Sequence, residues 1–305
     1  MQQALMSADW DYITIQQVSG YSGIYSSFEP YLKELIAYFK ELCPDAEILF
    51  HTTWAYSQDS THSDFAKYGK DQNTMHEAIE DAYLEASKNY GYVRLIPTGE
   101  AIRRARATKM GDNFNRDGYH LNDKGRLVAA LTWYETFTGI SALDAKVDLA
   151  SVIGTVGDTT GVAIGVTDEE NVLMRTAAHE AAVLFKKANE AQLAIESIGE
   201  VDKNSGEAIA KANTLRAELG DDDLLPNLQT LIDANNAFDN IVVIGDVSGD
   251  KVVDLNDVTE LARILAGWES TANEKALDVN ADGVVNLKDL VLLAQFVADW
   301  DVVLG

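Results

Sequence analysis

The C-terminal part of this 305-residue chain repeats itself with an offset of 32 residues. Each copy places oxygen-bearing side chains at regular positions of a twelve-residue stretch, which begins at Asp246 in the first copy and at Asp278 in the second. An apolar pattern typical of an amphipathic helix follows each stretch. A segment that repeats in this way is expected to fold as two similar loop-and-helix units packed together. The residues before the repeat show a different periodicity, so the chain has more than one domain.

The oxygen-bearing side chains occupy positions 1, 3, 5, 9 and 12 of each stretch, which is the spacing of an EF-hand calcium loop. Calcium requires six to eight hard oxygens at about 2.3–2.6 Å, and position 7 supplies one as a backbone carbonyl. Lys251 departs from the usual glycine at position 6, and position 12 is aspartate in place of glutamate. The alternative is a solvated acidic turn that only favours the start of a helix. We predict two Ca²⁺ ions, one held by Asp246, Ser248, Asp250, Val252, Asp254 and Asp257, and one by Asp278, Asn280, Asp282, Val284, Asn286 and Asp289.

Residues 245–298 resemble a type I dockerin, a paired calcium-loop module that attaches catalytic subunits to the cohesin domains of a scaffoldin in cellulosomes. The resemblance implies a cohesin partner and an extracellular, cellulosome-associated protein involved in polysaccharide degradation. It also implies that loop positions 10 and 11 and the following helix face the cohesin. These positions are Leu255, Asn256 and Arg263 in one copy and Leu287, Lys288 and Gln295 in the other. The alternative is an ordinary helix surface, with both leucines in the core.

Before the repeat, short apolar runs alternate with helical patterns. Strands are predicted at residues 11–16, 47–51 and 92–97, and helices at 28–42, 72–89, 100–108, 122–137 and 167–188. This alternation predicts a parallel sheet covered by helices. Three further helices, at 190–198, 205–219 and 226–238, follow without strands and resemble a three-helix spacer. We therefore predict an α/β domain over residues 1–188, a spacer over 189–240 and the dockerin over 241–305.

Asp117 and His120 stand three residues apart, directly before the predicted helix at 122–137. A carboxylate at this spacing can hold one imidazole nitrogen while the other faces a cleft, which prepares a general base. The motif by itself also fits a capped helix entry with a surface histidine. The polar end of the first strand adds context, because open α/β sheets bind ligands at the carboxyl edge of their strands.

The strings "DYITIQQVSGYSG", "EILFHTTWAY" and "FNRDGYHLNDKGR" together resemble the SGNH hydrolase superfamily over about residues 8–188. The resemblance implies a flavodoxin-like, three-layer α/β/α fold and hydrolysis of esters, often acetyl esters of plant polysaccharides. It makes His120 the base, Asp117 its orienting residue and Gln17 an oxyanion donor, with Gln16 or Ser19 as alternatives. His51 and Trp54 resemble cleft-wall residues, although core packing is an equal alternative.

By the same resemblance the serine nucleophile and a glycine donor precede Met1, so the α/β domain is expected to be truncated at its N-terminus. The chain carries no export signal in its first residues, which fits the same expectation. Whether the chain is an enzyme is therefore open: it is predicted to be either a docked ester hydrolase or a non-catalytic cohesin-binding protein. A net charge of −25 disfavours nucleic acid and anionic membranes as partners, and the lone Cys43 is expected to pack as an apolar side chain.

Overall fold

The computed structural model describes residues 1–147, 164–270 and 272–305. It divides into two compact units, which are described separately. The first comprises Met1–Glu196 and Ala212–Leu228, and the second comprises Ser197–Lys211 and Gln229–Gly305. The division passes through one helix, α7 (Gly206–Leu219), and close to the start of another, α8 (Leu228–Asp239).

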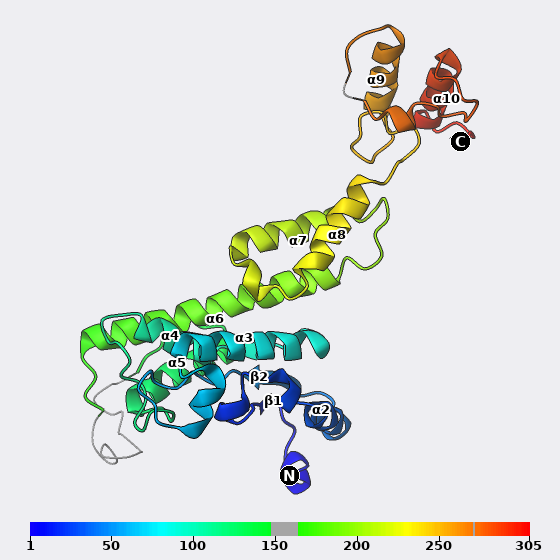
Figure 1. Cartoon of the computed structure of the whole chain (residues 1–305). Helices are drawn as coiled ribbons and strands as arrows, with labels where there is room; N and C mark the ends of the chain where they lie inside the picture. Colours follow the sequence, from blue (N-terminus) through cyan, green and yellow to red (C-terminus); the bar gives the residue numbers. More distant parts are fainter. Residues whose placement is uncertain (148–163, 271) are drawn as a thin grey trace. The chain divides into compact units, whose positions relative to one another are not determined.

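The first unit is built on a three-stranded parallel sheet in the order β1-β2-β3 (Figure 1). The strands are β1 (Tyr12–Ile15), β2 (Glu47–His51) and β3 (Leu95–Ile96), and β2 pairs with both neighbours. The mixed α/β fold with a parallel sheet is therefore confirmed. The third strand is shorter than predicted because the backbone turns at Tyr92, whose φ is +59°, and because Pro97 cannot donate to the ladder.

Helices connect and follow the strands. They are α1 (Gln2–Leu5), α2 (Tyr31–Leu42), α3 (Gln72–Asn89), α4 (Thr98–Arg106), α5 (Asp123–Thr138) and α6 (Asp168–Glu196). The side chain of Asp71 caps α3, and that of Asn122 caps α5 by accepting from the Gly125 N–H at 3.0 Å. The predicted break between residues 188 and 190 is wrong: α6 is one helix, because this stretch contains no glycine or proline and is rich in good helix formers.

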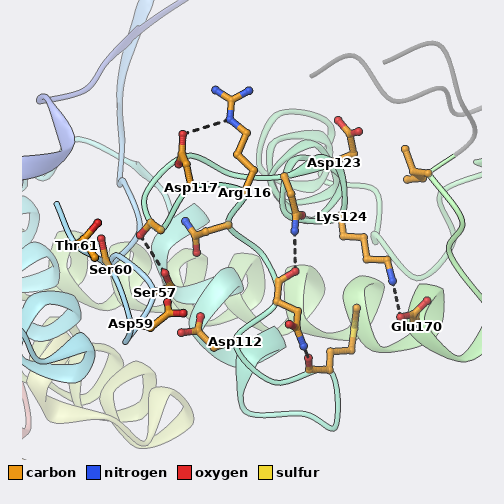
Figure 2. Close-up of a pocket in the computed structure, with 16 residues that line it drawn as sticks. Ser57, Asp59, Ser60, Thr61, Asp112, Arg116, Asp117, Asp123, Lys124 and Glu170 are labelled. Carbon is orange, nitrogen blue, oxygen red and sulfur yellow. Dashed lines mark hydrogen bonds and ion pairs between the residues drawn. The ribbon is translucent and has the colours of Figure 1, made fainter. Parts of the chain in front are cut away.

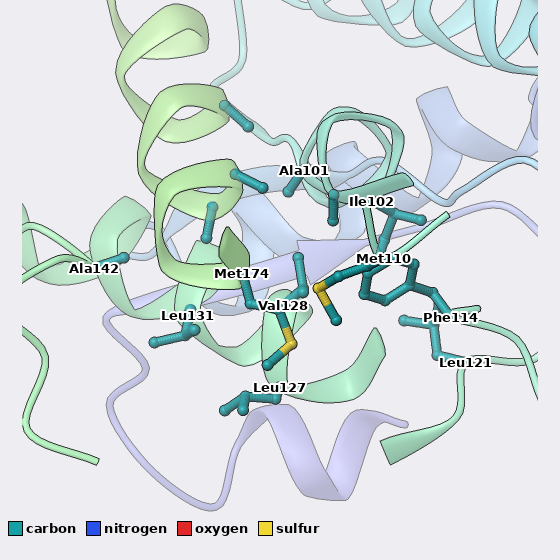
Figure 3. Packing of buried hydrophobic residues seen from close by; sticks show 14 of the residues in the cluster. Ala101, Ile102, Met110, Phe114, Leu121, Leu127, Val128, Leu131, Ala142 and Met174 are labelled. Atoms are coloured by element: carbon teal, nitrogen blue, oxygen red, sulfur yellow. The ribbon is translucent and has the colours of Figure 1, made fainter. Parts of the chain in front are cut away.

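One apolar core of the first unit lies where α4, α5 and α6 pack together (Figure 3). Ile102, Val128 and Met174 are fully buried there, and each comes from a different one of these helices. Small residues of α6, including Ala178 and Ala181, let the helices approach closely. Cys43 is unpaired and buried, as expected of an apolar side chain. This packing holds the loop before α5, which carries Asp117 and His120, against a rigid support.

The second unit includes two capped helices, α9 (Leu255–Leu265) and α10 (Leu287–Val297), one after each acidic loop. Each begins with a capping box: Asp254 with Asp257 in α9, and Asn286 with Asp289 in α10. The buried apolar core between them is small and consists of Val247, Leu261, Leu277, Val279 and Leu293. So small a core contributes little stability by itself.

Candidate functional site

The Asp117–His120 pair forms as the spacing predicts. Asp117 Oδ2 lies 2.8 Å from His120 Nδ1, and Asp117 Oδ1 accepts the backbone N–H of His120 at 2.8 Å. Desolvation raises the pKa of the Asp117 carboxyl, but the hydrogen bonds from His120 and from the Tyr119 N–H outweigh it and leave the pKa below its usual value. The carboxylate is thus ionised at neutral pH and holds the imidazole by one nitrogen.

The loop that carries this pair is held by backbone geometry as well as by side chains. Gly118 has a φ of +86°, and the Ser57 N–H and hydroxyl both donate to its carbonyl, at 2.9 and 3.1 Å. Arg106 forms an ion pair with Asp112 at 2.7 Å at the start of the loop. Ser57, Asp112 and Gly118 line a polar cavity beside the loop, shown in Figure 2. They fix where the imidazole of His120 lies.

A second cavity, of about 810 Å³, has His120 in its wall. His51 at the end of β2, Trp54 in the following loop and Trp133 of α5 also line it, so His51 and Trp54 are cavity-wall residues. We call it the tryptophan cavity. Among the described residues, no partner is recorded for His120 Nε2, so the second ring nitrogen of the dyad remains available there.

His51 is held neutral in this wall. Its Nδ1 lies 2.6 Å from Gln16 Oε1 and its Nε2 lies 2.8 Å from Thr98 Oγ1. Burial lowers the pKa of His51 to about 4. An imidazole that is neutral and bonded at both nitrogens cannot exchange protons with a substrate, so His51 is a structural part of the wall.

The predicted oxyanion donors are hydrogen-bonded to residues other than the dyad. Gln17 Nε2 donates to the carbonyl and hydroxyl of Ser27 at 3.0 and 3.2 Å, and the Ser19 hydroxyl bonds Tyr56 at 3.0 Å. Neither lines the tryptophan cavity. Gln16 reaches that wall indirectly, through His51. Within the described residues, no serine or cysteine side chain is hydrogen-bonded to His120 either.

Sequence reasoning found no partners for the other three histidines, and the structure supplies them. His62 Nδ1 accepts the Asp64 N–H at 3.2 Å, and His179 lies 2.9 Å from Glu135. His76 lies 3.3 Å from Glu100. Only the tertiary structure brings the last two pairs together, because their members are 44 and 24 residues apart along the chain.

One of these clusters has the donor types of a metal site, since His76, Glu80 and Glu100 place ligand atoms within 4.8 Å of one another. However, the buried Glu100 carboxylate already pairs with Arg103 at 2.5 Å and Arg104 at 2.7 Å. Desolvation raises its pKa, but hydrogen bonds from His76 and Arg103 outweigh this and lower it to about 2. Two arginines therefore supply the positive charge that a cation would bring.

The first acidic loop wraps around its own carboxylates. Asp246 and Asp257 are fully buried. Asp246 accepts the N–H of Gly249 at 2.8 Å and of Lys251 at 3.1 Å, and Asp257 accepts the N–H of Ser248 and of Asp254 at 2.8 and 2.7 Å. Lys251 takes the left-handed conformation, with φ +69°, that glycine usually provides at position 6. The backbone therefore adopts the tight turn of a calcium loop despite the unusual residue.

The second loop repeats this arrangement. Asp278 accepts the Gly283 N–H at 2.8 Å, and the fully buried Asp289 accepts the Asn286 N–H at 2.8 Å. Gly283 has φ +82°. A merely solvated acidic turn is inconsistent with burial of Asp246, Asp257 and Asp289.

The donor set fits calcium. Among the described residues, no lysine or arginine forms an ion pair with the loop carboxylates, apart from Lys288 with Asp282 at 3.7 Å. Buried carboxylates without a counter-charge are strongly destabilising, so these loops require a cation. Carboxylate, amide and carbonyl oxygens are ligands for a hard ion such as Ca²⁺.

The predicted partner-facing residues lie on the surface. Leu255 and Leu287 are each 68% exposed, so the alternative that they belong to the core is wrong. On α10, Leu287, Lys288 and Gln295 line a shallow groove. On α9, the guanidinium of Arg263 lies 5.5 Å from the ring of Trp268. Each repeat therefore offers an exposed leucine next to polar groups.

The structure defines a two-part protein: an α/β domain with a histidine–aspartate pair beside a cavity, and a module of two cation loops with their helices. Residues 1–155 match the family described as "Domain of unknown function (DUF4886)", and the chain belongs to this family. Residues 244–298 match the type I dockerin domain, so the chain also carries a dockerin. A type I dockerin indicates a cohesin partner and typically binds calcium, and dockerin proteins are typically extracellular cellulosome components.

Two solved structures are similar. A DUF4886 family protein from Bacteroides uniformis is 34% identical, with a TM-score of 0.53, and the match covers 60% of this chain and 66% of that chain. This chain thus spans slightly less than two thirds of that protein. A putative SGNH hydrolase from Slackia heliotrinireducens is 21% identical over 44% of this chain and 69% of that chain, with a TM-score of 0.36. No curated protein matches the chain. None of the described helices is both long and apolar enough to cross a membrane.

Proposed function

We propose that the chain is a cellulosomal subunit whose dockerin binds a cohesin and whose α/β domain contributes the general base of an ester hydrolase. The observation that carries the enzymatic part is the 2.8 Å contact between Asp117 Oδ2 and His120 Nδ1 beside a cavity. This arrangement orients an imidazole and stabilises its protonated form, which a general base requires.

In this proposal, His120 Nε2 takes the proton of a hydroxyl group as its oxygen attacks the ester carbonyl. The same nitrogen then returns the proton to the departing alkoxide, which leaves the acyl group on the attacking oxygen. Water then attacks this acyl group with the same two proton transfers, which releases the acid, regenerates the hydroxyl and leaves the ring neutral. Asp117 fixes the tautomer throughout. The resemblance to SGNH hydrolases implies that this hydroxyl belongs to a serine. Gln17 stays the predicted oxyanion donor from that resemblance, although its present bonds to Ser27 would have to break.

The test compares the 305-residue chain with the same chain extended upstream by a serine-bearing strand, using p-nitrophenyl acetate. We expect negligible hydrolysis by the 305-residue chain, because loss of the nucleophile from such a set leaves only weak residual catalysis. The extended chain should be active. His120→Ala should remove nearly all of that activity, and Asp117→Asn much of it.

His62→Ala is the matched control, because this imidazole lies 4.5 Å from the ring of Tyr119 but does not line the tryptophan cavity. It should leave the activity within about twofold. Turnover that survives His120→Ala would place the active site elsewhere.

The alternative function is cohesin binding alone, with an inert α/β domain. The two acidic loops favour docking in either case, since each offers a calcium donor set. We propose that two Ca²⁺ ions bind. Isothermal titration should give a stoichiometry of two, falling to one in Asp278→Ala, and a cohesin should bind in calcium but not in EDTA. If the extended chain binds cohesin yet hydrolyses no ester, docking is the whole function.

A further inference from the structure

The tryptophan cavity has a wall of uncharged rings held in place by hydrogen bonds. The indole N–H of Trp54 donates to the Tyr119 carbonyl at 2.7 Å, which fixes that ring. The imidazole of His51 meets Trp133 edge-on, with ring centroids 4.9 Å apart and planes at 78°. Since His51 is bonded at both nitrogens, this part of the cavity offers ring surfaces but no exchangeable charge. Such surfaces favour a flat, apolar ligand.

Trp133 differs from Trp54 in its polar atom. Among the described residues, no hydrogen-bond partner is recorded for the indole nitrogen of Trp133, and its side chain is only partly buried. Its N–H is thus a donor available to a ligand in the cavity. An indole donor beside an aromatic surface suits a ligand that has an acceptor at the edge of a ring.

The charge of the cavity is opposite to that of the chain. The chain has 49 acidic and 24 basic residues, yet among the described residues the charged side chains that line the cavity are Arg116 and Arg126, of which Arg126 pairs with Asp123 at 3.7 Å. Arg116 forms an ion pair with Asp117, with 3.6 Å between Arg116 Nε and Asp117 Oδ2 (Figure 2). The terminal nitrogens of Arg116 make no recorded hydrogen bond among the described residues. A guanidinium with both terminal nitrogens available matches a carboxylate in a bidentate geometry.

We propose that the tryptophan cavity binds an aromatic carboxylate, with its ring against Trp54 and Trp133 and its carboxylate at Arg116. Only the consequence for catalysis rests on the proposed function. Since His120 lines the same cavity, the substrate of the proposed hydrolase would be an ester with an aromatic acyl group, and the bound aromatic acid would be its product. Acetyl esters should then be hydrolysed more slowly than esters with an aromatic acyl group, because an acetyl group leaves the ring surfaces uncovered. The ligand class itself follows from the cavity alone.

Direct titration calorimetry with cinnamate tests the inference on the 305-residue chain, without any need for hydrolysis. Acetate, which has the carboxylate but no ring, and cinnamyl alcohol, which has the ring but no charge, are the comparison ligands. We expect cinnamate to bind at least tenfold more tightly than either. Trp133→Ala should weaken cinnamate binding at least tenfold and Arg116→Ala at least fivefold, while Trp133→Phe should retain most of the binding.

Trp10→Ala is the matched control, because this indole is exposed and lies outside the cavity. It should change binding by less than twofold. Circular dichroism of each variant separates a lost site from a lost fold, and Arg116→Ala decides the outcome if Trp133→Ala unfolds. No binding of cinnamate, equal binding of acetate, or an equal loss in Trp10→Ala would overturn the inference. Cinnamate binding without ester hydrolysis by the extended chain would overturn the proposed function and leave the inference standing.

Discussion

The α/β domain and the dockerin bury charged groups in opposite ways. In the α/β domain the buried Glu100 carboxylate lies against Arg103 and Arg104. In the dockerin, Asp246 and Asp257 are fully buried and form no ion pair with a basic side chain of the described residues. An unpaired buried charge costs roughly several kcal/mol. The first domain supplies its own counter-charge, whereas the second requires a cation from solution. The folding of one domain should therefore depend on packing, and that of the other on a metal ion.

Removal of calcium is the sharpest way to separate the two domains. Residues 241–305 hold 12 acidic and 4 basic side chains, a net charge of −8, around a core of five buried apolar residues. Without the ions, repulsion between the carboxylates should unfold this module, because metal binding there supplies folding free energy. Circular dichroism in EDTA should show a loss of helicity that excess Ca²⁺ restores. Equal helicity in EDTA and in calcium would refute the comparison.

A core substitution should affect only the α/β domain. Met174 on α6 is fully buried, and its replacement by alanine should lower the free energy of unfolding by about 2–5 kcal/mol. Leu193→Ala, at an exposed position of the same helix, should change it by less than about 0.5 kcal/mol. Urea denaturation of both variants measures the difference. Calcium-dependent helicity of the dockerin should be the same in each, and its loss in Met174→Ala would show that the domains do not fold independently.

The pH dependence of stability offers a smaller contrast. Desolvation raises the pKa of the Glu80 carboxyl group to about 7, although the nearby His76 acts to lower this pKa. Because the folded-state pKa lies above the unfolded value of about 4.5, the group's contribution to stability is full below pH 4.5 and is lost as the pH rises through 7. Glu80→Gln should therefore stabilise the α/β domain at pH 8 relative to the parent chain, by on the order of 1–2 kcal/mol, with little difference at pH 5.

Thermal unfolding of the two proteins at pH 5 and 8 measures this effect. Glu77→Gln, at an exposed position of the same helix, is the control. A gain in stability that is the same at both pH values would mean that Glu80 acts through something other than its ionisation.

The smallest expected effect concerns the two dockerin repeats, which match at their calcium positions but differ on the surface. Asn256 and Arg263 of the first copy correspond to Lys288 and Gln295 of the second. A cohesin surface complementary to one copy meets a different charge pattern at the other, so one binding orientation should dominate. One variant would carry the residues of the second copy in place of Asn256 and Arg263, and another the residues of the first copy in place of Lys288 and Gln295. Only one of these two variants should bind cohesin several-fold more weakly. Equal losses from both exchanges would show that neither face is preferred.

Local patterns in the sequence predicted several elements and local contacts correctly. Three strands were found by apolar runs, and α3 has the predicted bounds because its pattern and its Asp71 cap agree. The acidic loops were found because twelve consecutive residues contain the full ligand set. The Asp117–His120 contact is likewise local, because its two residues lie three positions apart in the same loop. The break expected within α6 failed for a related reason: the pattern alone could not distinguish one long helix from two short ones.

The sequence by itself determined the features whose partners are near neighbours: the loop carboxylates, the capping boxes and the His–Asp pair. Only the tertiary structure decided which distant residues meet. It brought His51, Trp54 and Trp133 into one wall together with two arginines, and joined Gln17 to Ser27 instead of to the dyad. It also put Leu255 and Leu287 on the surface when their apolar character fitted a core equally well. The physical reason is that contacts within one turn or loop follow from backbone geometry, whereas contacts between elements depend on how whole helices and strands pack.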